Sequence, residues 1–302
     1  MADSNGSTKP TDFDAYWDAV DEELSQHPHN AAMEHSPLRS TEFSDGYDVR
    51  LTSIGPYRIF GFLSIPKGEG PFPALIHAPR YGSVNHAPHY DEAERYVALA
   101  LMHRGQRLAD QPFAAAYPGL LTQGIDSPET YIYRSIVADC LRGAEWLMSL
   151  PQVDSSRVGI VGDDLAMLTA ARRPQISALQ YTTVILHRIM EARQKTDAYP
   201  VEEINDDLRL TPQREGQVAN TLSYFDPIHH ADRITADTVV VAGDDGTLNG
   251  PEWLTPLVNA VGGNAEIRQA SHEGGTDHDW LDAWMAQRLG VEARPRIWTV
   301  VK

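Results

Sequence analysis

The chain has 302 residues, of which 42% are apolar and 22% charged, and it carries a formal net charge of −17. That composition is typical of a globular protein. The excess negative charge repels phosphate backbones and anionic lipids, so we expect neither a nucleic-acid nor a membrane partner. Cys140 is the only cysteine, which excludes an intrachain disulfide. Because no signal peptide or long apolar run is visible, we expect a cytoplasmic protein.

The N-terminal part of the chain is predicted to be an arm with one helix, over residues 1–45. Residues 12–24 place apolar side chains at spacings of three and four, which is typical of an amphipathic helix. Polar sequence follows. Two β-rich stretches then cover residues 47–54 and 57–65, and the Gly55-Pro56 pair between them indicates a turn.

Beyond residue 65, short apolar runs alternate with helical patterns. The predicted strands are 73–78, 96–102, 157–162, 182–186, 238–242 and 265–270, and the predicted helices are 129–148, 165–173, one starting near Pro251 and one around 279–289. This alternation predicts an α/β fold over residues 46–302, with a doubly wound, mainly parallel sheet and helices on both faces. Residues 188–225 are polar and irregular, and we expect a cap-like insertion over the carboxyl ends of the strands.

Seven motifs occur along the chain: D-F-D-A-Y-W-D (12–18), R-I-F-G-F-L-S-I-P (58–66), H-R-G-Q (103–106), P-E-T-Y-I-Y-R (128–134), L-P-Q-V-D-S-S-R-V-G (150–159), L-S-Y-F-D-P (222–227) and S-H-E (271–273). Together they resemble the acetyl xylan esterase/cephalosporin C deacetylase family of α/β-hydrolases, in that family's own order. The resemblance implies an α/β-hydrolase fold, a small-molecule substrate and a ring-like homo-oligomer. We expect no cofactor.

By this resemblance the nucleophile position, serine in the pattern Gly-x-Ser-x-Gly, falls on Asp164. The family's histidine falls on His272. Its acid lies in residues 243–247 (G-D-D-G-T), where an ungapped match gives glycine, so we expect Asp245, or with less support Asp244, to orient His272.

The oxyanion tyrosine of the family resembles Tyr81, although H-A-P-R-Y-G contains two extra residues. Backbone N–H groups near Tyr81 and Leu165 are therefore the predicted oxyanion and substrate-binding groups.

An aspartate cannot replace the serine in ordinary deacetylation. It is already ionised, with an ordinary pKa of about 4, and attack on an ester carbonyl would form an anhydride. A carboxylate does suit attack on an sp3 carbon that carries a halide or an epoxide oxygen. His272 would then activate water against the resulting alkyl-enzyme ester. Alternatively, Asp164 and His272 act as general bases without covalent chemistry.

The sequence thus predicts an atypical hydrolase that acts through Asp164 and His272 on a small metabolite, acylated or otherwise activated. The alternatives are a lyase, epimerase or cyclase on the same scaffold, or a catalytically silent binding protein. In the silent case Asp164 would serve as a helix N-cap. We expect no metal, because neither His86 with His89 nor the run 272–279 has a recognised ligand spacing.

Overall fold

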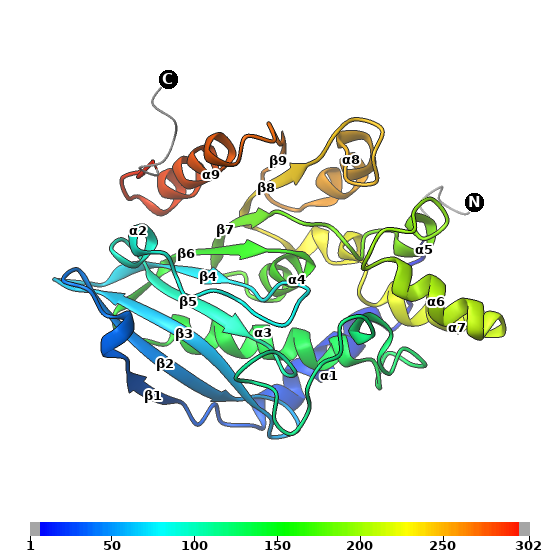
Figure 1. The fold of residues 1–302 in the computed structure, drawn as a ribbon, viewed down its shortest axis with the longest axis horizontal. Helices are drawn as coiled ribbons and strands as arrows, with labels where there is room; N and C mark the ends of the chain where they lie inside the picture. Colours follow the sequence, from blue (N-terminus) through cyan, green and yellow to red (C-terminus); the bar gives the residue numbers. More distant parts are fainter. Residues whose placement is uncertain (1–6, 296–302) are drawn as a thin grey trace.

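The computed structural model describes residues 7–295 and is built around a nine-stranded sheet (Figure 1). The strand order is β1-β2-β3-β5-β4-β6-β7-β8-β9. The strands are β1 (Ala32–His35), β2 (Ser44–Thr52), β3 (Arg58–Pro66), β4 (Phe72–His77), β5 (Val97–Met102), β6 (Val153–Gly162), β7 (Ile176–Tyr181), β8 (Asp237–Ala242) and β9 (Ala265–Gln269). Antiparallel pairing joins β1, β2, β3 and β5, and all other neighbours pair in parallel.

Helices cover both faces of this sheet, which confirms the predicted fold class. They are α1 (Phe13–Ser25), α2 (Tyr90–Ala93), α3 (Ile132–Met148), α4 (Asp164–Arg172), α5 (Ile189–Ala192), α6 (Glu202–Leu210), α7 (Glu215–Ser223), α8 (Pro251–Ala260) and α9 (Gly274–Leu289). Successive strand residues point to opposite faces. Ile76 and Ile160 therefore pack in the large core that contains α1, α3 and α4, whereas Leu75 packs with α9.

The predicted strand at 182–186 is wrong. The strand that follows α4 is β7, and residues 182–186 leave the sheet at its carboxyl end. Val184 and Leu186 are still buried and belong to the large core, although they lie outside the sheet. The amides of Ile185 and Leu186 donate to a carboxylate, that of Asp164, and not to a neighbouring strand. An apolar run indicates that residues are buried, and a loop held in place by a side chain can be buried as well as a strand.

Two further segments frame the site. Residues 188–225 lie between β7 and β8, contain α5, α6 and α7, and stand to the right of the sheet in Figure 1. Helix α1 packs into the same core, where Trp17 is fully buried and its indole N–H donates to the carbonyl of Tyr224 at 3.1 Å. Within residues 7–295, no helix combines the length and the apolar character needed to cross a bilayer.

Candidate active site

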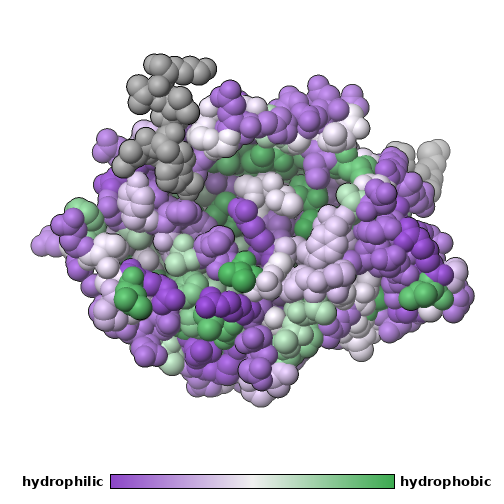
Figure 2. All heavy atoms as spheres, viewed as in Figure 1, coloured by the Kyte–Doolittle hydropathy of each residue, from purple (hydrophilic) through white to green (hydrophobic). Residues whose placement is uncertain are grey.

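The largest cavity near the predicted site has a volume of about 720 Å³ and is called the first cavity here. Its wall contains residues 183–185 and His187 after β7, seven residues of the insertion between 192 and 201, and residues 246–249 after β8, together with Arg80, Tyr81, Asp163 and Trp253. The carboxyl ends of parallel strands are the usual place for a ligand in such a fold. Figure 2 shows that the molecule is hollowed near the middle of the face drawn, with apolar residues inside and hydrophilic residues around them.

Asp163 supplies the carboxylate on the wall of the first cavity. Asp163 is the N-cap of α4, and one of its carboxylate oxygens accepts the amide N–H of Leu165 at 3.0 Å. The other oxygen accepts the amide N–H of Tyr81 at 3.1 Å. Burial, reinforced by the charge of Asp164, raises the pKa of Asp163. The two predicted oxyanion amides are thus brought together, and they hold a carboxylate of the chain itself.

Asp164 points to a different place. It begins α4, it is 2% exposed, and it does not line the first cavity. Its carboxylate accepts the hydroxyl of Tyr181, and the amides of Ile185 at 3.0 Å and Leu186 at 3.2 Å. Burial raises its pKa too. Since Ile185 lines the cavity and Asp164 does not, Asp164 holds that part of the wall from behind.

His272 lies on the exposed loop between β9 and α9. Its Nε2 lies 2.9 Å from a carboxylate oxygen of Asp244, and both side chains are more than half exposed. Asp244, and not Asp245, therefore makes the contact that orients this ring. None of these three residues lines the first cavity. The catalytic roles assigned to Asp164, His272 and Asp245 stay predictions.

A second histidine does line the first cavity. His187 is 1% exposed, and its Nδ1 lies 3.3 Å from a carboxylate oxygen of Asp226. Asp226 also accepts the amides of Arg188 at 3.1 Å and Ile228 at 3.2 Å. Although burial opposes this, the His187 contact and the Ile228 amide hold the pKa of Asp226 below its usual range. Within the described chain, His187 Nε2 is buried without a hydrogen-bond partner.

Sequence reasoning missed the His187–Asp226 pair. Asp226 belongs to the L-S-Y-F-D-P motif, and His187 follows the apolar run 182–186 directly. Asp226 thus lies in a motif of the sequence and His187 next to a predicted strand, but no local pattern links the two. They are 39 positions apart, and only the path of the insertion brings them together.

Tyr81 is fixed by the insertion. Its hydroxyl donates to the buried carboxylate of Glu203 on α6. Glu203 also accepts the amides of Gly119 at 2.8 Å and Leu121 at 3.0 Å. The loop that carries the Tyr81 amide is thereby joined to α6 and to the 119–121 turn, so the amide facing Asp163 has a defined position. Over residues 7–295, no group of three or more His, Cys, Asp or Glu side chains is arranged to hold a metal ion.

Comparison with known proteins identifies the family. The family model described as acetyl xylan esterase (AXE1) matches residues 4–286. Acetyl esterase Axe7A of Xylanibacter ruminicola is 25% identical over 252 residues, which are 78% of this chain and 56% of that protein, so the chain spans little more than half of that relative's length.

Two solved structures are similar over nearly their whole length. The acetyl xylan esterase from Paenibacillus sp. R4 has a TM-score of 0.81 and 26% identity, with 93% of this chain and 96% of that chain covered. Acetyl xylan esterase 1 from Thermoanaerobacterium sp. JW/SL YS485 has the same TM-score and 24% identity, with 94% and 96% covered. The chain therefore belongs to the acetyl xylan esterase (AXE1) family and is an enzyme with the α/β-hydrolase fold.

Proposed function

We propose that this enzyme hydrolyses a small activated metabolite in the first cavity, and that the carboxylate of Asp163 replaces the serine nucleophile. The observation that carries the proposal is the position of Asp163. It lines the cavity with its two oxygens on the amides of Tyr81 and Leu165, while no serine or cysteine is among the lining residues of the described chain. In this proposal, the role predicted for Asp164 passes to its neighbour.

The first step is attack on carbon. A carboxylate oxygen of Asp163 forms an ester bond to an sp3 carbon of the substrate, and the leaving atom takes the electron pair of the broken bond. A halide departs as the anion, whereas an epoxide oxygen stays on the neighbouring carbon and takes up a proton from water. Both amides are engaged by the carboxylate, so an ester substrate finds no free donors for its own oxyanion. This favours an epoxide or an alkyl halide over an acetyl ester. The volume of about 720 Å³ is in the range of small-molecule sites.

The second step is hydrolysis of the alkyl-enzyme ester. Nε2 of His187 takes a proton from water as the water attacks the ester carbonyl. The oxyanion forms on the carboxylate oxygen that is not bonded to the substrate, and the amide on that oxygen, of Tyr81 or of Leu165, stabilises it. The bond from the acyl carbon to the oxygen that Asp163 gave to the substrate then breaks, and the alcohol leaves with that oxygen and with the proton from His187. Asp226 fixes the ring by occupying Nδ1, which leaves Nε2 available.

The sequence predicted that Asp164 and His272 act together, and the structure places these two residues differently from Asp163 and His187. Asp164 has three donors on its carboxylate and lies outside the cavity, and His272 is paired with Asp244 at the surface. These placements support Asp163 and His187 as the acting residues. The homo-oligomer and the cytoplasmic location implied by the sequence stay predictions.

Intact-protein mass spectrometry tests the proposal. Wild type and the variants His187→Ala, His272→Ala and Asp163→Asn are incubated with styrene oxide, 1-bromohexane and an acetylated xylobiose. We expect His187→Ala to slow the second step about 10²–10⁴-fold and so to accumulate an alkyl adduct on Asp163. His272→Ala should turn over without an adduct, and Asp163→Asn should give neither product nor adduct.

Three results would contradict the proposal. The first is an adduct on Asp164 that accumulates only in His272→Ala, which would return the roles to the predicted pair. The second is hydrolysis of the acetylated sugar by Asp163→Asn at the wild-type rate. The third is turnover of an electrophile in which no variant accumulates an adduct, which would favour proton transfer without covalent catalysis.

A further inference from the structure

A second cavity, of about 420 Å³, lies on the side of the sheet that α9 covers. Its floor comes from the carboxyl ends of β4, β6 and β7, and its walls come from residues 84–92 and from α9. Apart from Arg80, its lining shares no residue with the first cavity. The proposed reaction uses none of the residues on its floor or walls.

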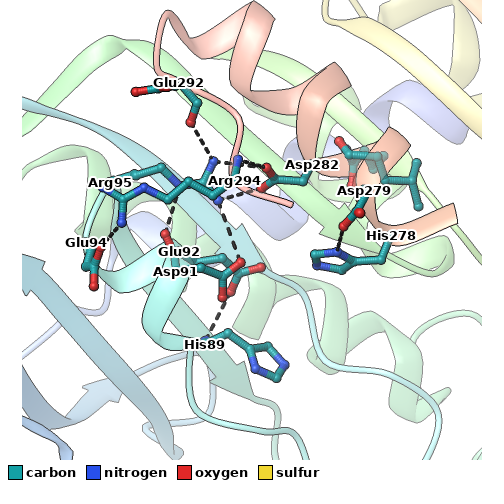
Figure 3. A network of polar contacts seen from close by, with 12 residues as sticks. His89, Asp91, Glu92, Glu94, Arg95, His278, Asp279, Asp282, Glu292 and Arg294 are labelled. Atoms are coloured by element: carbon teal, nitrogen blue, oxygen red, sulfur yellow. Dashed lines mark hydrogen bonds and ion pairs between the residues drawn. The ribbon is translucent and has the colours of Figure 1, made fainter. Parts of the chain in front are cut away.

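The two walls of the second cavity are joined by ion pairs, so its shape exists before any ligand binds. Arg95 follows α2, and its guanidinium pairs with the carboxylate of Asp282 on α9 (Figure 3). The nitrogen–oxygen distance of this pair is 2.5 Å. The same guanidinium donates to the carbonyl of Asp91 at 2.8 Å. On the floor, Nε2 of His77 lies 3.0 Å from a carboxylate oxygen of Glu92, which also accepts the amide of His89 at 3.2 Å.

These pairs also decide the charge that a ligand would meet. Both carboxylates of the lining have a partner. Asp282 pairs with the guanidinium of Arg95, and Glu92 lies beside the ring of His77, whose pKa it raises against the effect of burial. The guanidinium of Arg80 is different. It is exposed, and over residues 7–295 its side chain makes no hydrogen bond or ion pair with another residue, although its charge acts on the carboxylate of Asp163 and on the ring of His77. In a chain whose net charge is −17, a preformed cavity with one free guanidinium on its wall selects a single negative charge.

Part of the remaining lining is suited to an apolar body. Leu75, Leu281 and Met285 line the cavity together with the ring of Tyr96, and polar side chains such as Asn85 and Gln180 line other parts of it. The hydroxyl of Tyr96 is buried with no hydrogen-bond partner in the described chain, so a donor stands unused beside the cavity. We propose that the second cavity binds a small organic monocarboxylate, with its carboxylate on Arg80 and its apolar body against Met285.

NMR of wild-type enzyme labelled with ¹³C at the methionine methyl groups tests this inference, because Met285 is the methionine in the lining of the second cavity. The probes are hexanoate and its neutral isostere hexanamide, and Met285→Leu assigns the resonance. We expect hexanoate to shift the Met285 methyl resonance saturably, with at least tenfold higher affinity than hexanamide. An unmoved Met285 resonance, or equal affinity for the two probes, would overturn the proposal.

Variants then locate the site, because Arg80 lines both cavities. Arg80→Gln should weaken hexanoate at least tenfold, whereas Arg107→Gln, an exposed control that lines neither cavity, should change the affinity less than twofold. Ala87→Trp fills the second cavity and should abolish binding, and Ala198→Trp obstructs the first and should leave it intact. Both tryptophan variants are checked for folding by circular dichroism. If Ala198→Trp abolished binding and Ala87→Trp left it intact, hexanoate would bind in the first cavity and the inference would be refuted.

Discussion

Replacement of Asp164 by alanine should cost more stability than replacement of Asp163, although the two residues are adjacent. Asp164→Ala leaves three donors without an acceptor, namely the Tyr181 hydroxyl and the amides of Ile185 and Leu186. An orphaned buried donor costs about 1–3 kcal/mol, which gives about 3–9 kcal/mol for the three. Removal of a buried charge returns a few kcal/mol of desolvation. We therefore expect a net loss of about 2–5 kcal/mol in the free energy of unfolding.

Asp163→Ala loses an N-cap, worth about 1 kcal/mol, and the acceptor of the Tyr81 amide. Because that site lines a cavity, water replaces part of the loss, and we expect about 1–2 kcal/mol in total. Urea denaturation at pH 7 measures both values, with Asp164→Asn as the isosteric control that keeps an acceptor oxygen. If Asp164→Ala lost less than 1 kcal/mol and activity together, while Asp163→Ala stayed active, the assignment of the two roles would be wrong.

Three further predictions concern the groups around the site. Burial raises the pKa of Asp163 and Asp164, so the stability that they contribute is complete below about pH 4 and is lost as pH rises through the raised values. The free energy of unfolding of D163N/D164N, measured relative to wild type, should therefore grow between pH 4.5 and 8, and a constant difference would contradict this. Gln106→Ala removes two hydrogen bonds to the carbonyls of Arg80 and Gly82, in the loop that carries Tyr81, and should raise KM. An unchanged KM would refute the positioning role. Asp139→Ala leaves the buried guanidinium of Arg104 uncompensated and should cost about 3–5 kcal/mol in chemical denaturation, whereas a loss below 1 kcal/mol would mean that the pair is not buried as described.

The sheet was largely predictable because its strands and helices alternate with clear apolar periods. Residues 73–78 and 238–242 were predicted as strands and correspond to β4 and β8 within one residue at each end. Strand β1 was not predicted, since Ala32–His35 is exposed throughout and has no apolar alternation. It forms because β2 offers an edge to pair with, and a pairing partner distant in sequence leaves no local pattern.

The candidate site was predictable as a region and not as a set of contacts. The sequence located the turn after β6. It could not tell which of the two adjacent aspartates in that turn faces the cavity, because this depends on the backbone conformation of each. Asp163 is extended, with φ −90° and ψ −154°, and faces the cavity, whereas Asp164 is the first helical residue and points behind its wall. Nor could periodicity reveal that Asp226 meets His187, because that contact depends on how the whole insertion folds over β7.

Transfer of oxygen from water to the enzyme tests the central claim most directly. A single turnover in H₂¹⁸O, with an electrophile that the wild type hydrolyses, is followed by proteolysis and fragment mass analysis of the peptide that contains residues 163 and 164. If water attacks the carbonyl of an Asp163 ester, one ¹⁸O atom must appear in the Asp163 side chain and none in the first alcohol released. Label in the alcohol with none in the enzyme, or label on Asp164, would contradict the account.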